Sequence, residues 1–101
     1  MRDHAKDAKV FKALCNEYRL QVLEMLRSGE KCACELNDKI DLSQSTLSHH
    51  MKILVESGIV SARQDGKWMR YSISKEGSEN ALRLLGEITH VEEAPSHASC
   101  C

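Results

Sequence analysis

The chain has 101 residues, of which 42% are hydrophobic and 29% charged, and its formal net charge is −1. This composition is typical of one small globular domain and excludes a fibrous chain, a disordered chain and a bulk polycation. The sequence has no apolar run of about 18 residues, and its charged start lacks the apolar stretch of a secretory signal, so we expect a cytoplasmic protein.

The charged residues are distributed unevenly. Residues 43–75 carry five basic and two acidic residues, whereas residues 76–101 carry one basic and five acidic residues. A positive middle segment followed by a negative end indicates an anionic partner that is held at one place.

The first two predicted helices each have the apolar spacing of a helix with one buried face. Residues 4–14 form the first helix, which begins near Asp3. The second helix carries leucines at every third position and ends at Gly29. Glycine supplies the left-handed residue that commonly follows the end of a helix.

A short helix and a longer helix follow, joined by a tight turn. The short helix covers residues 32–40, and the hydroxyl group of Ser43 can cap the longer one. Leu47, Met51 and Leu54 lie on one face of the longer helix, and its opposite face is polar. A short helix, a turn and a helix with a hydrogen-bonding outer face together predict a helix-turn-helix.

The spacing then changes from that of a helix to that of strands. Residues 59–64 and 67–74 are separated by Asp65-Gly66, a strong signal for a two-residue hairpin. A hairpin directly after a helix-turn-helix predicts the wing of a winged helix. Residues 75–91 return to helical spacing and carry an apolar stripe.

The predicted fold is therefore mainly α with a small β-hairpin (α+β): a winged helix-turn-helix of four helices, the hairpin and a last helix. We expect residues 1–91 to form a DNA-binding and dimerisation domain, and residues 92–101 to form a flexible, cysteine-containing tail. The first and last helices each carry an apolar face that so small a domain can scarcely cover. We therefore expect a homodimer packed through these two helices.

The outer face of the fourth predicted helix supplies the candidate DNA-reading residues. These are Gln44, Ser45, Thr46, Ser48, His49 and His50. The N-terminal half of such a helix enters the major groove, where glutamine can pair with adenine and hydroxyl groups contact base edges or phosphates. Thr46 and His50 can turn partly inward, because their neighbours Leu47 and Met51 face the core.

Basic residues around the hairpin are the predicted phosphate contacts. They are Lys52, Arg63, Lys67 and Arg70. Such contacts position a protein on DNA rather than select a sequence, and they make binding fall steeply with salt. Trp68 either stacks near the DNA backbone or, as the favoured alternative, anchors the hairpin as an apolar residue.

The five cysteines are the second candidate site: Cys15, Cys32, Cys34, Cys100 and Cys101. The odd count and the missing export signal argue against a disulfide framework, and favour metal ligands or redox-active thiols. Side chains two positions apart point to nearly opposite sides of a regular helix. Cys32 and Cys34 can therefore bind one ion only if the helix starts between them or is distorted there. We expect such a distortion to change the orientation of the fourth predicted helix, which is the recognition helix of the helix-turn-helix.

Three segments together closely resemble the ArsR/SmtB family of metal-responsive repressors: VFKALCNEYRLQVLEMLRSGEKCACEL, LSQSTLSHHMKILVESGIV and ARQDGKWMRYSIS. They span roughly residues 8–90 in the family's order and spacing. The resemblance implies a dimeric winged-helix repressor that binds operator DNA when metal-free and leaves it when metal binds. In this family, a Cys-x-Cys at the start of the third helix is characteristic of arsenic and antimony sensors, and of related cadmium and lead sensors. An arsenic-resistance operon is the implied target.

The chain departs from the family pattern at two places. Asn37 stands where arsenic sensors usually carry a third cysteine. The family's carboxylate–histidine site on the last helix is also missing, and His90 with Glu93 is its nearest remnant. The missing carboxylate–histidine site leaves the cysteines as the expected metal site.

We expect Cys32 and Cys34 to bind As(III) or Sb(III), with Cd(II) or Pb(II) as alternatives and no organic cofactor. Soft ions favour sulfur, and both Lys31 and a helix start favour the thiolate form. Arsenite takes three thiolates, so a third must come from elsewhere. Cys100 or Cys101 is favoured, from the same subunit or its partner, because an extended tail spans about 30 Å. Cys15 is expected to be a core residue rather than a ligand.

Three alternatives have different functions. A thiol redox enzyme is disfavoured by the lack of a glycine-rich cofactor loop and of alternating strands and helices, and we expect no catalysis. A repressor released by oxidation of its thiols keeps the same fold. A metal carrier without DNA leaves the polar helix face and the basic hairpin unexplained.

Overall fold

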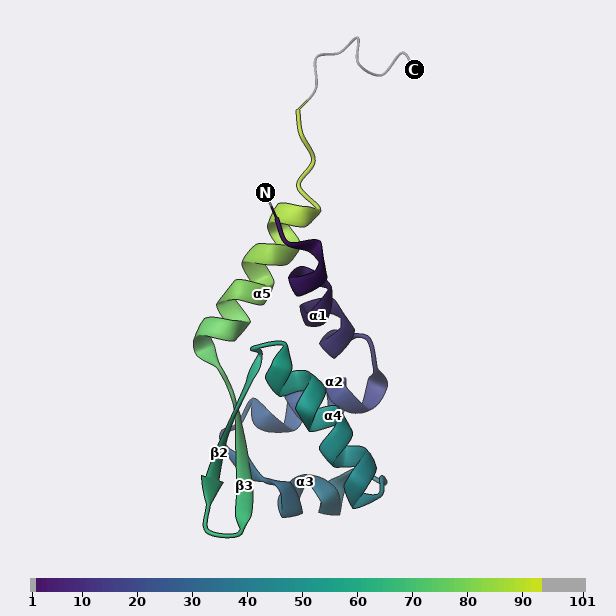
Figure 1. Ribbon diagram of the computed structural model, residues 1–101, viewed down its shortest axis with the longest axis vertical. Coiled ribbons are helices and arrows are strands. Elements are labelled where there is room, and N and C mark those ends of the chain that lie inside the picture. The colour runs from purple at the N-terminus through teal and green to yellow at the C-terminus, as the bar shows by residue number, and fades with distance from the viewer. Residues whose placement is uncertain (1, 94–101) are drawn as a thin grey trace.

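The computed structural model describes residues 2–93 and forms a winged helix-turn-helix (Figure 1). Its elements are α1 (His4–Leu14), α2 (Glu17–Leu26), β1 (Lys31–Cys32), α3 (Ala33–Lys39), α4 (Gln44–Glu56), β2 (Val60–Asp65), β3 (Trp68–Ile73) and α5 (Lys75–Ile88). This order confirms the predicted fold class and adds one short strand, β1. The predicted tail lies outside the described residues except for Glu92 and Glu93.

The helices begin where polar side chains can cap them. Asp3, Asn16, Ser43 and Ser74 each accept a hydrogen bond from a backbone N–H in the first turn of the helix that follows. Such caps satisfy backbone donors that have no partner within the helix. The predicted starts near Asp3 and after Ser43 are therefore confirmed.

The three strands form an antiparallel sheet in the order β1-β3-β2. Asp65 pairs with Trp68, so the hairpin turn is Gly66-Lys67 and not the predicted Asp65-Gly66. Gly66 has a φ of +63°, and no non-glycine residue in the described chain has a positive φ. A positive φ at the first turn residue alone fits a type II′ turn, and this geometry moves the turn by one residue.

Apolar residues from all five helices and from the sheet form one core. Its most deeply buried large side chains are Leu36, Met51, Leu54 and Val22. The last helix joins this core through Leu84, and it begins in close backbone contact with the end of α4. A side chain at Gly77 would collide with the carbonyl group of Gly58.

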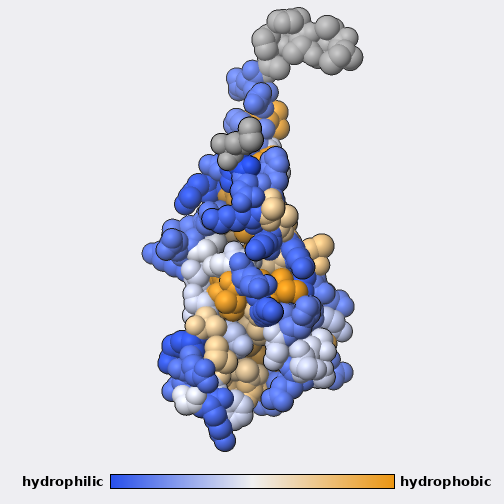
Figure 2. Space-filling view, viewed as in Figure 1, coloured by the Kyte–Doolittle hydropathy of each residue, from blue (hydrophilic) through white to orange (hydrophobic). Residues whose placement is uncertain are grey.

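The molecule has two distinct ends. Helices α1 and α5 lie at one end, and α3, the start of α4 and the β2–β3 hairpin form the other (Figure 1). Hydrophilic residues cover most of the hairpin tip, while apolar residues gather nearer the middle (Figure 2). No helix in the described chain is long and apolar enough to cross a membrane.

Candidate DNA interface and thiol site

The start of α4 presents a polar surface to solvent. Its exposed side chains are Gln44, Ser45, Thr46, Ser48, His49 and Lys52. Leu47, Met51 and Leu54 are buried beneath them. The Ser43 hydroxyl accepts a hydrogen bond from the backbone N–H of Thr46 (3.2 Å) and donates one to the Thr46 hydroxyl (2.8 Å). The exposed groups are thus held on the first turns of a capped helix.

His50 does not belong to this exposed surface, which corrects its prediction as a DNA contact. Its side chain is buried, and its Nδ1 lies 2.9 Å from Nη1 of Arg19 on α2. Because a guanidinium can only donate, Nδ1 must be the acceptor, and the imidazole is neutral. Burial, together with the positive charges of Arg19 and His49, lowers the pKa of His50.

Arg19 is a buried cation held by uncharged acceptors. Its exposed fraction is 7%, and it also donates to the backbone carbonyl groups of Ala13 (3.1 Å) and Lys12 (2.8 Å). These carbonyls lie at the C-terminus of α1, where the helix macrodipole is negative. Arg19 therefore connects the end of α1 to the recognition helix.

The wing arginines are paired with carboxylates. Arg63 donates two hydrogen bonds of 2.8 Å to the carboxylate of Glu30, and Nε of Arg70 donates to Asp65 at 2.7 Å. The bonds from Arg63 lower the pKa of Glu30, and the bond from Arg70 lowers the pKa of Asp65. Of the three predicted basic residues of the wing, only Lys67 lacks a carboxylate partner within the described chain.

The Trp68 ring is exposed at the base of the hairpin turn rather than buried as an apolar anchor. Its exposed fraction is 41%, and the ammonium group of Lys67 lies 5.6 Å from the ring centroid. The pair is within the range of a cation–π contact. Trp68 is thus available to a partner of the wing, as the prediction that it stacks near the DNA backbone requires.

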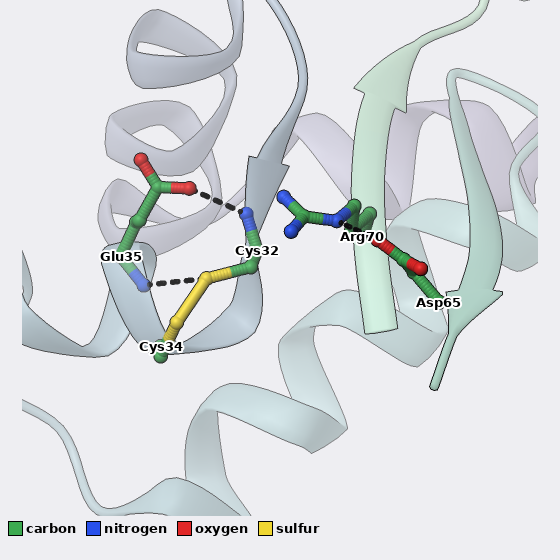
Figure 3. The surroundings of a disulfide bond; sticks show 5 residues. All are labelled: Cys32, Cys34, Glu35, Asp65 and Arg70. Atoms are coloured by element: carbon green, nitrogen blue, oxygen red, sulfur yellow. Dashed lines mark hydrogen bonds and ion pairs between the residues drawn. A yellow bond between two sulfur atoms is a disulfide. The ribbon is translucent and has the colours of Figure 1, made fainter. Parts of the chain in front are cut away.

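Cys32 and Cys34 meet at the start of α3, where a disulfide joins them (Figure 3). Cys32 is buried and extended, and it is the N-cap of α3; Cys34 lies in the first turn and is exposed. The Cys32 sulfur accepts the backbone N–H of Glu35 (3.3 Å), and the Glu35 carboxylate accepts the N–H of Cys32 (3.0 Å). This reciprocal capping box fixes the start of the helix.

This geometry matches the first of the two predicted alternatives, a helix that starts between the cysteines, and not the expected distortion. The prediction started the helix at Cys32, but the pairing of β1 with β3 keeps Cys32 extended, and α3 begins at Ala33. The helix therefore starts between the two cysteines. Their side chains converge, with a Cα–Cα distance of 5.3 Å, while α3 stays regular. Helix α3 does not have to unwind for both sulfur atoms to face one ion.

The remaining predicted thiol residues lie in different surroundings. Cys15 is exposed at the C-cap of α1, which corrects its prediction as a core residue. Lys31 donates to Ser28 and to the Gly29 carbonyl group. Cys100 and Cys101 lie outside the described residues. Within residues 2–93, no three potential ligand side chains among His, Cys, Asp and Glu gather into a metal site.

Three features escaped sequence reasoning: strand β1, the buried Arg19 and the carboxylates that pair with the wing arginines. Asp65 and Arg70 flank the turn, so the opposite charges in the predicted hairpin could have indicated their pairing. Glu30 is 33 positions from Arg63 and gives no such signal. Arg19 is one of many charged residues in its segment, and its burial follows from the packing of α2 against α1 and α4.

Comparison with known proteins agrees with this architecture. Residues 16–62 match the family described as "Bacterial regulatory protein, arsR family". The "Arsenical resistance operon repressor" of Staphylococcus aureus is 43% identical over 79 residues, which cover 78% of this chain and 76% of that protein. The "Cadmium resistance transcriptional regulatory protein CadC homolog" of the same species is 40% identical over 70 residues, covering 68% and 58%.

A solved structure shares the fold along most of both chains. HlyU from Vibrio cholerae is 34% identical, with a TM-score of 0.68, and the match covers 88% of this chain and 98% of that one. A winged helix-turn-helix with a polar recognition helix defines a DNA-binding transcriptional regulator. The chain belongs to the ArsR family of such regulators.

Proposed function

We propose that this protein is a metal(loid)-responsive repressor that binds operator DNA when metal-free and is released when As(III) or Sb(III) binds its cysteine thiolates. The observation that carries the proposal is the convergence of the Cys32 and Cys34 side chains at the start of the first helix of the helix-turn-helix. A relative that acts as an arsenical resistance operon repressor supports this choice, and control of an arsenic-resistance operon is the corresponding role.

The chemistry of the reduced cysteine pair fits a soft ion. Two thiolates supply the sulfur ligands that arsenite, antimonite, cadmium and lead favour. The backbone N–H of Glu35 points at the Cys32 sulfur, and a donor at a helix start stabilises a thiolate over a thiol. A three-coordinate metalloid needs one more sulfur, for which Cys100 or Cys101 remains our proposal.

Binding at this pair acts where the helix-turn-helix begins. Helix α3 carries Cys34, and only four residues separate its end from the start of α4. A third ligand from the tail would act on the helix-turn-helix at its α3 end. Since α3 itself stays regular, we propose that release follows from a shift of α3 relative to α4 and the wing, rather than from unwinding.

We propose that the protein acts as a dimer through α1 and α5, in the cytoplasm. Helix α5 and the residues after it expose Leu82 (74%), Leu85 (49%), Ile88 (43%) and Val91 (82%). Exposed apolar residues on one terminal helix are expected where a second copy packs. A dimer would place two recognition helices on successive half-sites of the operator. Sedimentation that showed only a monomer at micromolar concentration would contradict this assembly.

The test is arsenite-driven release of DNA from the reduced full-length protein. Protein reduced with a phosphine is titrated onto a fluorescent duplex from its own promoter, and anisotropy is followed as arsenite is added. We expect DNA affinity to fall about 5- to 150-fold, the range of a coupling free energy of 1–3 kcal/mol. Cys32→Ser and Cys34→Ser should remove the response, and Cys15→Ser should keep it. Unchanged release in Cys32→Ser and Cys34→Ser would contradict the site.

Parallel titrations define the inducer and the third ligand. Cadmium and lead replace arsenite in matched experiments, since a relative is a cadmium resistance regulator. Cys100→Ser and Cys101→Ser, singly and together, test the tail. A full response without either tail cysteine would contradict the proposed source of the third thiolate.

The Cys32–Cys34 disulfide favours a second candidate, a repressor that responds to thiol oxidation. Two thiols form one disulfide by losing two protons and two electrons to an oxidant, and one hydrogen peroxide is reduced to two waters. The oxidised pair has no thiolate to offer arsenite. This candidate predicts DNA release by peroxide without metal, reversed by a phosphine, whereas the metal(loid) sensor predicts release only when arsenite is added.

A further inference from the structure

Both arginines of the wing are already bound by carboxylates of the same chain. Arg63 meets Glu30 through two parallel hydrogen bonds, the geometry in which a guanidinium also binds phosphate. Arg70 meets Asp65 in the same hairpin. Any phosphate that approaches these guanidinium groups must displace a carboxylate or share the guanidinium with it.

The four charged side chains lie on one face of the sheet. Arg63 is directly opposite Arg70, and Arg70 is directly opposite Cys32 on β1. Directly paired residues of antiparallel strands point to the same face, as do residues two apart in one strand, so Asp65 shares the face of Arg63. Figure 3 shows Arg70 between Cys32 and Asp65. Glu30 lies two residues before Cys32 and reaches the same face through its bonds to Arg63.

These pairs are exposed enough to exchange partners. The side chains of Arg63 and Arg70 are 58% and 33% exposed, and those of Glu30 and Asp65 are 33% and 50% exposed. Exposed ion pairs contribute little net stability, so a DNA phosphate can replace the carboxylate at small cost. The displaced carboxylate would then lie beside the DNA backbone and repel it.

We propose that Glu30 and Asp65 are built-in competitors of DNA phosphate, which weaken the grip of the wing and reduce its dependence on salt. This inference rests on the proposed role of Arg63 and Arg70 as phosphate contacts, but not on metal sensing. An arginine that exchanges a carboxylate for a phosphate adds less net positive charge to the complex than a free arginine, so fewer counterions leave the DNA.

The test measures binding of reduced, metal-free protein to a fluorescent duplex over a series of salt concentrations. Glu30→Gln and Asp65→Asn should each raise affinity about 2- to 5-fold per subunit, as expected for the loss of one exposed competing pair. Each should also steepen the slope of log affinity against log salt, by up to about 0.9 per phosphate newly neutralised.

Asp38→Asn is the matched control, because it removes the same charge from an exposed residue of α3 that forms no ion pair within residues 2–93. A double-mutant cycle adds the sharper criterion: Glu30→Gln should have a smaller effect on affinity once Arg63 is replaced by Gln. Circular dichroism of each variant establishes that it is folded.

Two outcomes would overturn the inference. Equal effects of Glu30→Gln, Asp65→Asn and Asp38→Asn would show a general charge effect without competition. An undiminished effect of Glu30→Gln in the Arg63→Gln background would show that the carboxylate does not act through Arg63. Failure of the wild type and all variants to bind any duplex would instead contradict DNA binding itself.

Discussion

The molecule holds its arginines in two contrasting ways. Arg19 is 7% exposed and is bound by two backbone carbonyl groups and a neutral imidazole, and no carboxylate of residues 2–93 pairs with it. Arg63 and Arg70 on the wing are far more exposed and are bound by carboxylates. The buried arginine has neutral partners, whereas the exposed arginines have charged ones.

This difference separates an arginine with a structural role from arginines that can exchange their partners. A buried cation cannot lose its hydrogen bonds cheaply, so Arg19 fixes the recognition helix against the end of α1. An exposed ion pair is worth little and can open for another anion. We therefore infer that Arg19 positions the recognition helix, and that Arg63 and Arg70 contact the DNA backbone.

The largest expected effect is on stability, from Arg19→Met. Removing the guanidinium leaves two carbonyl groups and Nδ1 of His50 without a donor in a buried region. We expect the free energy of unfolding to fall by about 2–3 kcal/mol, measured by urea denaturation. Arg83→Met on α5 is the matched control, since Arg83 is exposed and should tolerate the change. A decrease in the free energy of unfolding of less than about 0.5 kcal/mol in Arg19→Met would contradict the structural role of Arg19.

A smaller effect on stability is expected from Arg63→Gln and Arg70→Gln. Each should change the free energy of unfolding by less than about 1 kcal/mol, because the pairs are exposed. DNA affinity should nevertheless fall, and the salt slope should flatten by less than about 0.9 per lost phosphate contact, since Glu30 and Asp65 already offset part of the charge. Unchanged DNA affinity in both variants would show that the wing makes no backbone contact.

The smallest expected effect is a pH dependence of stability from His50. Its pKa is lowered by burial and by the charges of Arg19 and His49, so the unfolded chain takes up a proton at a pH where the folded chain does not. The contribution of His50 is complete above the unfolded pKa of about 6.5 and is lost as the pH falls below it. Tyr18 is the other ring near the imidazole, with the two ring centroids 6.0 Å apart.

Urea denaturation from pH 8 to pH 5 measures this loss. His50→Gln keeps an acceptor for Arg19 that does not titrate, so its stability should fall less steeply over this range. His4→Gln, on the exposed surface of α1, should follow the wild type. Identical pH profiles for His50→Gln and the wild type would mean that folding does not lower the pKa of His50.

Local features of the sequence predicted most of the fold. The caps at Asp3 and Ser43 depend on residues within one turn, and the apolar spacing of α4 identified its buried face. Of the two errors of one residue, the first has a distant cause and the second a local one. Pairing of β1 with β3 starts α3 after Cys32, and the turn geometry at Gly66 sets the hairpin register.

The candidate site was only partly predictable because partners far apart in sequence decide it. Periodicity places His50 at the edge of the buried face of α4, but only Arg19 from α2 explains why it points inward. Cys15 follows an apolar run, yet the chain turns there between two helices and leaves its side chain exposed. The Cys32–Cys34 pair was predicted because a Cys-x-Cys at this place is part of the resemblance to the family. That α3 stays regular beside the pair became clear only from the three-dimensional structure.

The most direct test of sulfur-controlled DNA release is the arsenite affinity of the reduced protein, measured by calorimetry once free and once saturated with operator DNA. Thermodynamic linkage requires that a ligand which expels DNA binds more weakly to the DNA complex, by the same factor. We predict a 5- to 150-fold weaker arsenite affinity in the complex, and no such difference for Cys32→Ser. Equal arsenite affinities of the free and the DNA-bound wild type would contradict it.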